Sequence, residues 1–360
     1  MNRAVMILAG GTGGHVYPGL AVAEALRAEG CELFWMGTRR GIESRVVPAA
    51  GLPLLLVPVA GLRRSGAWRW LTAPVTVGSA LLCALVHMIR IRPRVVLGMG
   101  GFVSGPGGVA AWLCRRPLVI HEQNAIPGLT NRLLARIASR VCEAFPGTFA
   151  AARSARTCGN PVRQDIAALA PPAQRLGGRE TPSVLVFGGS RGARALNETV
   201  PAALASSGMT GLRVLHQCGE VDVAATRARY AALAGRADVE VTPYIDDMAG
   251  AYAMADLVIA RAGALTVAEL AASGVASILV PYPHAVDDHQ TANARYLVDA
   301  GAALLVPERE LDVVRLGAEI ARLLCDRTRL LDMAERAHAL ARPDAVTLVA
   351  RSCLEYVDAD

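Results

Sequence analysis

The stretch AVMILAGGTGGH at residues 4–15 decides the fold, because in it an apolar run passes directly into a glycine-rich loop. A second stretch of this kind, SVLVFGGSRGARALN, occupies residues 183–197. Such runs are typical of buried strands, and glycines let the backbone that follows approach a ligand closely. A helix that begins after the loop also offers free N–H groups to an anion. The two stretches therefore predict two related strand–loop–helix units.

The remainder of the chain predicts a parallel sheet in each half. Its 360 residues suit two domains, and short apolar runs alternate with amphipathic stretches, as in βαβ units. Strands are expected at 4–8, 32–36, 53–57, 95–97, 118–120 and 141–144, then at 183–187, 213–217, 239–242, 257–259, 276–280 and 303–306, with helices such as 19–29 and 129–138 between them. Residues 166–182, rich in Pro, Gly and charge, read as the passage between the halves. We predict an α/β protein with two Rossmann-like domains facing a central cleft at the carboxyl ends of their strands.

Composition excludes several classes of protein. With 53% hydrophobic and 19% charged residues, the chain can bury large cores and is not intrinsically disordered. All 37 basic residues are Arg, which excludes a Walker phosphate loop and Schiff-base chemistry because both need a lysine amine. The net charge of +6, without a basic stripe interleaved with aromatics, does not indicate nucleic acid. Eight Cys without a C-x-x-C pair suit a reducing cytosol, and the first apolar run is too short for a signal peptide.

Each glycine-rich loop has a ligand-binding interpretation and a purely structural one. In the first loop, Val16 stands where the dinucleotide fingerprint G-x-G-x-x-G would place its third glycine, so that fingerprint does not fit. His15, read by itself, is better explained as an ordinary loop histidine. In the second loop, the Ser190 hydroxyl and free N–H groups could hold a phosphate, or the loop is a plain turn.

Two later motifs indicate a nucleotide more strongly. RAGALT at 261–266 brings a backbone-rich loop to a helix start, and Glu269 follows about one turn later. A carboxylate there could accept both ribose hydroxyls, although an acid in a first turn also stabilises the helix dipole. The polar cluster at 283–290 contains no metal-ligand spacing, and the only D-x-D ends the chain at 358–360. No metal or other cofactor is therefore expected.

Eight motifs together carry a resemblance to a known family. They are GGTGGHVYPGLAVAEAL, GMGGFVSGPGG, HEQNAIPGLTNR, GNPVR, GGSRGARALN, YIDDM, RAGALTVAEL and DDHQTANA, and they run in family order from residue 10 to residue 293. The chain resembles the MurG family, hexosyltransferases that move GlcNAc from UDP-GlcNAc to the MurNAc C4 hydroxyl of lipid I and so give lipid II in peptidoglycan synthesis. The resemblance implies a GT-B fold and an inverting reaction.

The resemblance also implies site residues. His15 is the family's candidate general base; Ile245 would contact the uracil through its backbone, Glu269 the ribose and Gln290 the sugar. The positions implied for UDP-GlcNAc binding are Thr12, Gly13, Gly14, Asn124, Arg163, Ser190, Ile245, Ala264, Leu265, Thr266, Val267, Ala268, Glu269 and Gln290. The departures are slight, since Ala262 and Ala292 stand where relatives often have Ser or a larger residue.

The family's acceptor is a membrane lipid, and the uncharged run at residues 71–89 is a candidate for contact with the membrane. Pro74, Gly78 and His87 inside the run favour a buried or surface-lying helix over a span. Arginine attracts anionic headgroups and Trp prefers the interface, so Arg63, Arg64, Trp68, Arg69 and Trp70 are expected to contact the membrane.

Domain roles, location and partners also follow from the resemblance. Residues 1–163, with a last helix at about 341–360 packed back on them, would face acceptor and membrane, and residues 164–340 would bind UDP-GlcNAc. The expected location is the cytoplasmic side of the inner membrane, as a peripheral protein. The expected partners are the lipid I acceptor, anionic inner-membrane lipids and proteins of cell-wall synthesis and division.

Two other functions fit the sequence less well. A nicotinamide-dependent oxidoreductase would close its second strand with an acidic residue, where this chain has Met36, Gly37 and Thr38. A non-catalytic nucleotide-binding or membrane module would have no reason to pair a donor pocket with His15.

Overall fold

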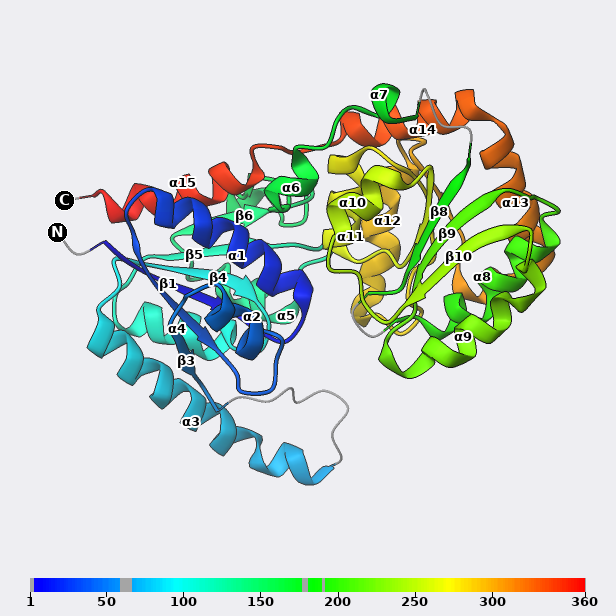
Figure 1. Cartoon of the computed structure of the whole chain (residues 1–360). Helices are drawn as coiled ribbons and strands as arrows, with labels where there is room; N and C mark the ends of the chain where they lie inside the picture. The colour runs from blue at the N-terminus through cyan, green and yellow to red at the C-terminus, as the bar shows by residue number, and fades with distance from the viewer. Residues whose placement is uncertain (1–2, 59–66, 177–180, 190–191, 360) are drawn as a thin grey trace. The chain divides into compact units, whose positions relative to one another are not determined.

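A computed structural model describes residues 3–58, 67–176, 181–189 and 192–359. The chain divides into two compact units, which Figure 1 shows in the colours of the sequence. Unit 1 comprises Met1–Arg163 and Asp344–Asp360, and unit 2 comprises Gln164–Pro343.

Unit 1 is built on a parallel sheet of seven strands in the order β3-β2-β1-β4-β5-β6-β7. The strands are β1 (Ala4–Ala9), β2 (Glu32–Gly37), β3 (Leu54–Leu56), β4 (Val95–Gly100), β5 (Leu118–Glu122), β6 (Arg140–Glu143) and β7 (Arg156–Thr157). The order reverses between β1 and β4, and the loops that leave these two strands are the glycine-rich ones. In parallel sheets, this switch point is where ligands bind.

Helices cover both faces of the unit 1 sheet, which is why its central strands are apolar on both sides. Helices α1 (Gly13–Ala28) and α15 (Ala345–Val357) share one core with Val5 and Ile7 of β1. On the other face, α3 (Ala67–Ile91) and α4 (Ser104–Leu113) share a core with Met6 and Leu8. The remaining helices are α2 (Glu43–Ala49), α5 (Leu129–Leu134) and the short η1 (Ala151–Arg153).

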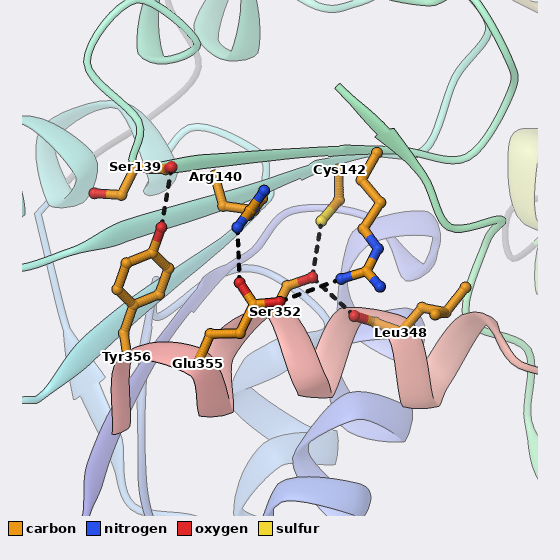
Figure 2. A network of polar contacts seen from close by, with 8 residues as sticks. Ser139, Arg140, Cys142, Leu348, Ser352, Glu355 and Tyr356 are labelled. Carbon is orange, nitrogen blue, oxygen red and sulfur yellow. Dashed lines mark hydrogen bonds and ion pairs between the residues drawn. The ribbon is translucent and has the colours of Figure 1, made fainter. Parts of the chain in front are cut away.

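The last helix, α15, is held on the first unit by side chains from β6 and β7, as Figure 2 shows. Glu355 accepts hydrogen bonds from Arg140 at 2.8 Å and from Arg156 at 3.3 Å. The Tyr356 hydroxyl donates to the Ser139 carbonyl at 3.1 Å. The helix's own side chains Val349, Ala350, Cys353 and Val357 are buried, so it is tied to unit 1 by apolar packing and polar contacts together.

Unit 2 repeats the plan with six parallel strands in the order β10-β9-β8-β11-β12-β13. They are β8 (Ser183–Phe187), β9 (Leu212–Gln217), β10 (Ala237–Thr242), β11 (Leu257–Ala260), β12 (Ala276–Leu279) and β13 (Ala303–Leu305). Its helices are α6 (Gln164–Ala167), α7 (Pro172–Leu176), α8 (Arg194–Ser206), α9 (Val223–Arg229), α10 (Met248–Met254), α11 (Ala264–Ser273), α12 (His289–Val298), α13 (Val313–Cys325) and α14 (Arg327–Ala339), with short turns η2 (Glu220–Asp222), η3 (Tyr230–Leu233), η4 (Val286–Asp288) and η5 (Glu308–Glu310). The order reverses between β8 and β11, again beside two glycine-containing loops.

The predicted α/β class with two Rossmann-like parallel sheets is confirmed, and each of the twelve expected strands is present. Four details differ. The short edge strand β7 was not predicted, α1 begins at Gly13 rather than near residue 19, the helix expected at 129–138 ends at Leu134, and the passage 166–182 contains α7. Among the described helices, none is long and apolar enough to cross a membrane.

Candidate active site

The first glycine-rich loop of unit 1 lies against the loop that follows β4. Gly101 has a φ of +83°, and a Cβ atom there would lie 2.2 Å from the Gly10 carbonyl oxygen, so only glycine fits. Thr12 is exposed and precedes α1, which begins at Gly13. The first N–H groups of this helix therefore point out of the loop at the switch point.

A buried carboxylate holds this loop in place. Glu43 is fully buried, and its Oε2 accepts a hydrogen bond from the Gly11 N–H at 3.0 Å. Its Oε1 accepts from the backbone N–H of Thr38 at 2.9 Å and from the Thr38 hydroxyl at 2.6 Å. Glu43 thereby connects the loop after β1 to the loop after β2 through three hydrogen bonds to a charged acceptor.

His15 lies in the first turn of α1, half-buried, with its Nδ1 3.0 Å from Oε1 of Gln123. Gln123 follows β5 and is buried. The contact joins residues 108 positions apart in the chain, and it brings His15 beside the HEQN motif.

Asn124 of the same motif is positioned by Glu122, another buried glutamate. Oε1 of Glu122 accepts from the Asn124 backbone at 2.9 Å and from its side-chain amide at 3.1 Å. Oε2 accepts from the N–H of Gly128 at 3.1 Å and from the amide of Asn131 at 2.9 Å. The carboxylate shapes the loop that carries Asn124.

Sequence reasoning missed these glutamates and Gln123. A third one, Glu143, accepts from the backbone N–H groups of Gly147 and Phe149, both at 3.0 Å. Glu122 and Glu143 each close an apolar strand, in LVIHE and RVCE. An acid at that position was the available signal, because strand ends in parallel sheets are followed by loops whose N–H groups need acceptors.

In unit 2, the start of α11 combines free N–H groups with a buried acid. Gly263 precedes the helix and provides no side-chain cap, so the first N–H groups from Ala264 to Thr266 face outward. Glu269 is 7% exposed, and its Oε2 accepts a hydrogen bond from the Tyr252 hydroxyl at 3.0 Å. A helix start without a side-chain cap and an oriented carboxylate thus occur within one helix.

The side chain of Val267 is fully buried, and its N–H donates to the Gly263 carbonyl at 2.9 Å. The binding role expected of Val267 stays a prediction, and a contact with the donor would be made by the backbone rather than by the side chain. Leu265 and Ala268 are half-buried, and Ala264 is buried.

The loop after β12 is organised by Arg261. Its Nη1 donates to the carbonyls of Val280 and Pro281, each at 3.1 Å, its Nη2 pairs with Glu308, and its guanidinium lies over the Tyr282 ring at 5.4 Å. The N–H of Tyr282 donates to Oε1 of Gln290 at 2.9 Å. Arg261 thus stabilises the loop whose Tyr282 N–H orients Gln290.

The other expected site residues are placed less tightly. Arg163 ends the first of the two segments of unit 1 and is half-buried, and Ile245 is 9% exposed after β10. Ser190, Arg63 and Arg64 lie outside the described residues, as do the side chains of Trp68, Arg69 and Trp70, although these three belong to α3. In the part of the chain that the structure describes, no three His, Cys, Asp or Glu side chains group to hold a metal ion.

The two sheets, with their glycine loops at both switch points, define the GT-B class of glycosyltransferases. Residues 5–143 match the glycosyltransferase family 28 N-terminal domain, and residues 183–349 match the glycosyltransferase family 28 C-terminal domain. The chain belongs to glycosyltransferase family 28.

Relatives match along the whole length. A protein of Nitrosococcus oceani is 56% identical over 358 residues, 99% of both chains, and is named UDP-N-acetylglucosamine–N-acetylmuramyl-(pentapeptide) pyrophosphoryl-undecaprenol N-acetylglucosamine transferase. A Methylococcus capsulatus protein of the same name is 53% identical over 359 residues, 100% of both chains. The crystal structure of Acinetobacter baumannii MurG superposes with a TM-score of 0.85 at 41% identity, covering 98% of this chain and 99% of that one. The predicted resemblance is confirmed.

Proposed function

We propose that this protein is an inverting hexosyltransferase that moves GlcNAc from UDP-GlcNAc to the C4 hydroxyl of the MurNAc of lipid I, giving lipid II and UDP. The observation that carries the proposal is 56% identity over 99% of both chains to a transferase named for this donor and this acceptor. The glycine loops at both switch points support it, because they suit a phosphorylated donor and acceptor.

The donor would be held by unit 2. The N–H groups at the start of α11 would face the diphosphate, and the carboxylate of Glu269, oriented by the hydrogen bond from Tyr252, would accept from the ribose. The oxygen of Gln290 accepts from Tyr282, so its amide nitrogen would donate to a sugar hydroxyl. Ile245 would meet the uracil through its backbone. Thr12, Gly13, Gly14, Asn124, Arg163 and Ser190 remain proposed donor contacts.

His15 would act as the general base. The C4 hydroxyl proton of the acceptor passes to its imidazole, the oxygen attacks the anomeric carbon, and the bond to the UDP oxygen breaks. A single displacement inverts the α-linked donor to a β-linked product. Imidazole suits this role because, among side chains, it titrates nearest neutral pH.

The base assignment is tested by the His15→Ala variant. Turnover with UDP-GlcNAc and a soluble lipid I analogue should fall by about 10²-fold or more, while calorimetric UDP affinity stays near that of the parent. Turnover within a few-fold of the parent would reduce His15 to a positioning residue.

We also propose that unit 1 docks on the membrane through α3. The inner face of this helix is buried at Ala80, Ala84 and Met88. Its outer face carries exposed apolar side chains, with Val75 75%, Leu82 64%, Val86 45% and Ile89 60% exposed. These positions recur at helical spacing, so they form one stripe along the helix. An apolar stripe of this kind suits the acyl boundary of a bilayer.

Exposed basic and aromatic residues near α3 support the proposal that this side of unit 1 docks on the membrane. Arg90 and Arg92 are exposed at the end of α3, and Trp112 and Arg115 are exposed at the end of α4 on the same side of the sheet. Arginine attracts anionic headgroups and Trp prefers the interface. The proposed location is therefore the inner membrane, as a peripheral protein, with anionic lipids as partners; proteins of cell-wall synthesis and division remain expected partners.

A further inference from the structure

We propose that Gln123 and His121 form a relay that fixes the tautomer of His15, placing its proton on Nδ1 and leaving Nε2 free to accept a proton. This inference rests on the proposed role of His15 as the base. Gln123 and His121 are positioning residues, since they act on His15 rather than on substrate.

The relay begins at His121, which is fully buried at the end of β5. Its Nε2 lies 2.9 Å from the Gly159 carbonyl oxygen. A carbonyl can only accept, so Nε2 carries the proton and Nδ1 is an acceptor. Burial lowers the pKa of His121 to about 4, against smaller rises caused by its hydrogen bond to Gly159 and by the charge of Glu122, and His15 lowers it slightly further. His121 is therefore neutral at cytosolic pH.

Gln123 takes its orientation from that nitrogen. Its Nε2 lies 3.1 Å from Nδ1 of His121 and 2.8 Å from the Met99 carbonyl oxygen. Both partners accept, so the amide nitrogen must face them. The amide oxygen, Oε1, is consequently turned toward His15.

His15 completes the relay. Oε1 of Gln123 can only accept, so Nδ1 of His15, 3.0 Å away, must donate. A neutral imidazole carries one proton, which leaves Nε2 with a free lone pair. Gly100 lies beside this same contact, because a Cβ atom at this position, whose φ is +98°, would lie 2.8 Å from Nδ1 of His15 and 3.4 Å from Oε1 of Gln123.

The strand periodicity explains why the motif places these residues together. Side chains alternate along a strand, so His121 and Gln123 point to one side and Glu122 to the other. Glu122 there accepts N–H groups of the loop at 124–131, while Glu43, the carboxylate after β2, accepts from Gly11 and Thr38. Both carboxylates accept hydrogen bonds from these loops, so the side-chain amide of Gln123 is the group that contacts the ring of His15.

Nitrogen NMR of the full-length protein tests the tautomer directly. Protein labelled with ¹⁵N-histidine is recorded without substrate at about pH 8, above the ordinary pKa of an imidazole, and the spectrum of His15→Gln identifies the His15 signals. We expect the ¹⁵N chemical shift of Nδ1 to be that of a protonated imidazole nitrogen and the shift of Nε2 to be that of an unprotonated one. A proton on Nε2 overturns the relay.

Two substitutions test the consequence for turnover. Gln123→Met removes the amide, so kcat should fall about 10-fold or more, the donor KM should stay within about twofold, and the Nε2 signal should move toward the protonated position. Gln123→Glu keeps an oxygen facing His15 but loses both N–H donations. It should retain more turnover than Gln123→Met, and the acid limb of its kcat/KM profile should move up by about one pH unit, because a carboxylate stabilises the imidazolium.

A merely structural role for Gln123 predicts a different pattern. Both variants would then lose turnover alike, with an unmoved acid limb, which would overturn the relay. Failure of the base assignment is distinguishable from failure of the relay. An active His15→Ala variant would refute the role of His15 as the base, whereas the tautomer of His15 is decided separately by the spectrum of the parent. The parent's spectrum also decides the question if either variant fails to fold.

Discussion

The hydroxyl of Tyr252 donates a hydrogen bond to Oε2 of Glu269 over 3.0 Å, and both side chains are buried. The bond holds the carboxylate in one orientation before any donor arrives, so less ordering remains to be done on binding. The donor site that we propose therefore includes a residue, from α10, that no motif in the sequence indicates.

Tyr252→Phe should weaken UDP binding by about fivefold, which corresponds to about 1 kcal/mol for a lost hydrogen bond. Glu269→Ala should weaken it more, because the ribose then loses its acceptor. Calorimetric titration with UDP measures both. Tyr296→Phe is the matched control, since that hydroxyl donates to the Leu340 carbonyl in the same unit; an equal effect in this control would refute the Tyr252 role.

Glu43→Gln should lower both stability and turnover. An amide at this position can keep an oxygen toward Thr38 but then turns its N–H₂ group toward the N–H of Gly11, which loses its acceptor. We expect the free energy of unfolding to fall by about 2 kcal/mol. UDP affinity should fall less than turnover does, because the donor contacts proposed for unit 2 are untouched and only those of Thr12, Gly13 and Gly14 depend on this loop. Urea unfolding and calorimetry test this, and unaltered turnover in a folded variant would show that the loop does not depend on Glu43.

Buried histidines predict how stability depends on pH. Burial lowers the pKa of His121 and of His216 from 6.5 to about 4. Between these values the unfolded chain binds more protons than the folded one, so the free energy of unfolding should fall as pH decreases from about 6.5 to about 4. Above pH 6.5 these two groups contribute no pH dependence.

Urea midpoints at pH 7 and pH 5 measure this dependence. His216→Gln should reduce the difference between the two midpoints, because one of the two buried groups no longer titrates. His284→Gln, which changes an exposed histidine in the same unit, is the control and should leave the difference unchanged. Equal differences in parent and His216→Gln would contradict the explanation.

The α3 stripe predicts membrane affinity. The triple substitution of Leu82, Val86 and Ile89 by Ser should release the protein from anionic phospholipid vesicles in a co-sedimentation assay, because the apolar contribution is lost. High salt should release the parent only partly, since screening weakens the Arg contribution alone. Val221→Ser with Val314→Ser, which alters exposed apolar residues of unit 2, should bind like the parent; binding of the triple variant at the parent's level would place the membrane face elsewhere.

Much of the fold was predictable because short stretches of sequence determine its strands and loops. Uniform apolar runs such as AVMILA predict strands that are buried on both faces, and the glycines after them predict the loops. The edge strand β7 was missed because its two residues, Arg156 and Thr157, are polar and too few to form a pattern.

The sequence proposed residues of the candidate site only where a motif names them. His15, Glu269 and Gln290 were proposed in this way and stay predictions, whereas Gln123, Glu43 and Tyr252 were not proposed. Their roles depend on which N–H groups the loops leave without a partner and on which strands lie side by side. Gln123 reaches His15 because β5 is separated from β1 only by β4, and no local pattern carries that order.

The central claim is tested most directly by a transfer assay with a panel of UDP-sugars and a soluble lipid I analogue, with the product identified by mass spectrometry and its linkage by NMR. The account predicts transfer of GlcNAc from UDP-GlcNAc to the MurNAc C4 hydroxyl through a β linkage, with release of UDP and little transfer from UDP-glucose or UDP-galactose. A folded protein that binds UDP-GlcNAc but forms no such product, or that forms an α-linked one, would contradict the account.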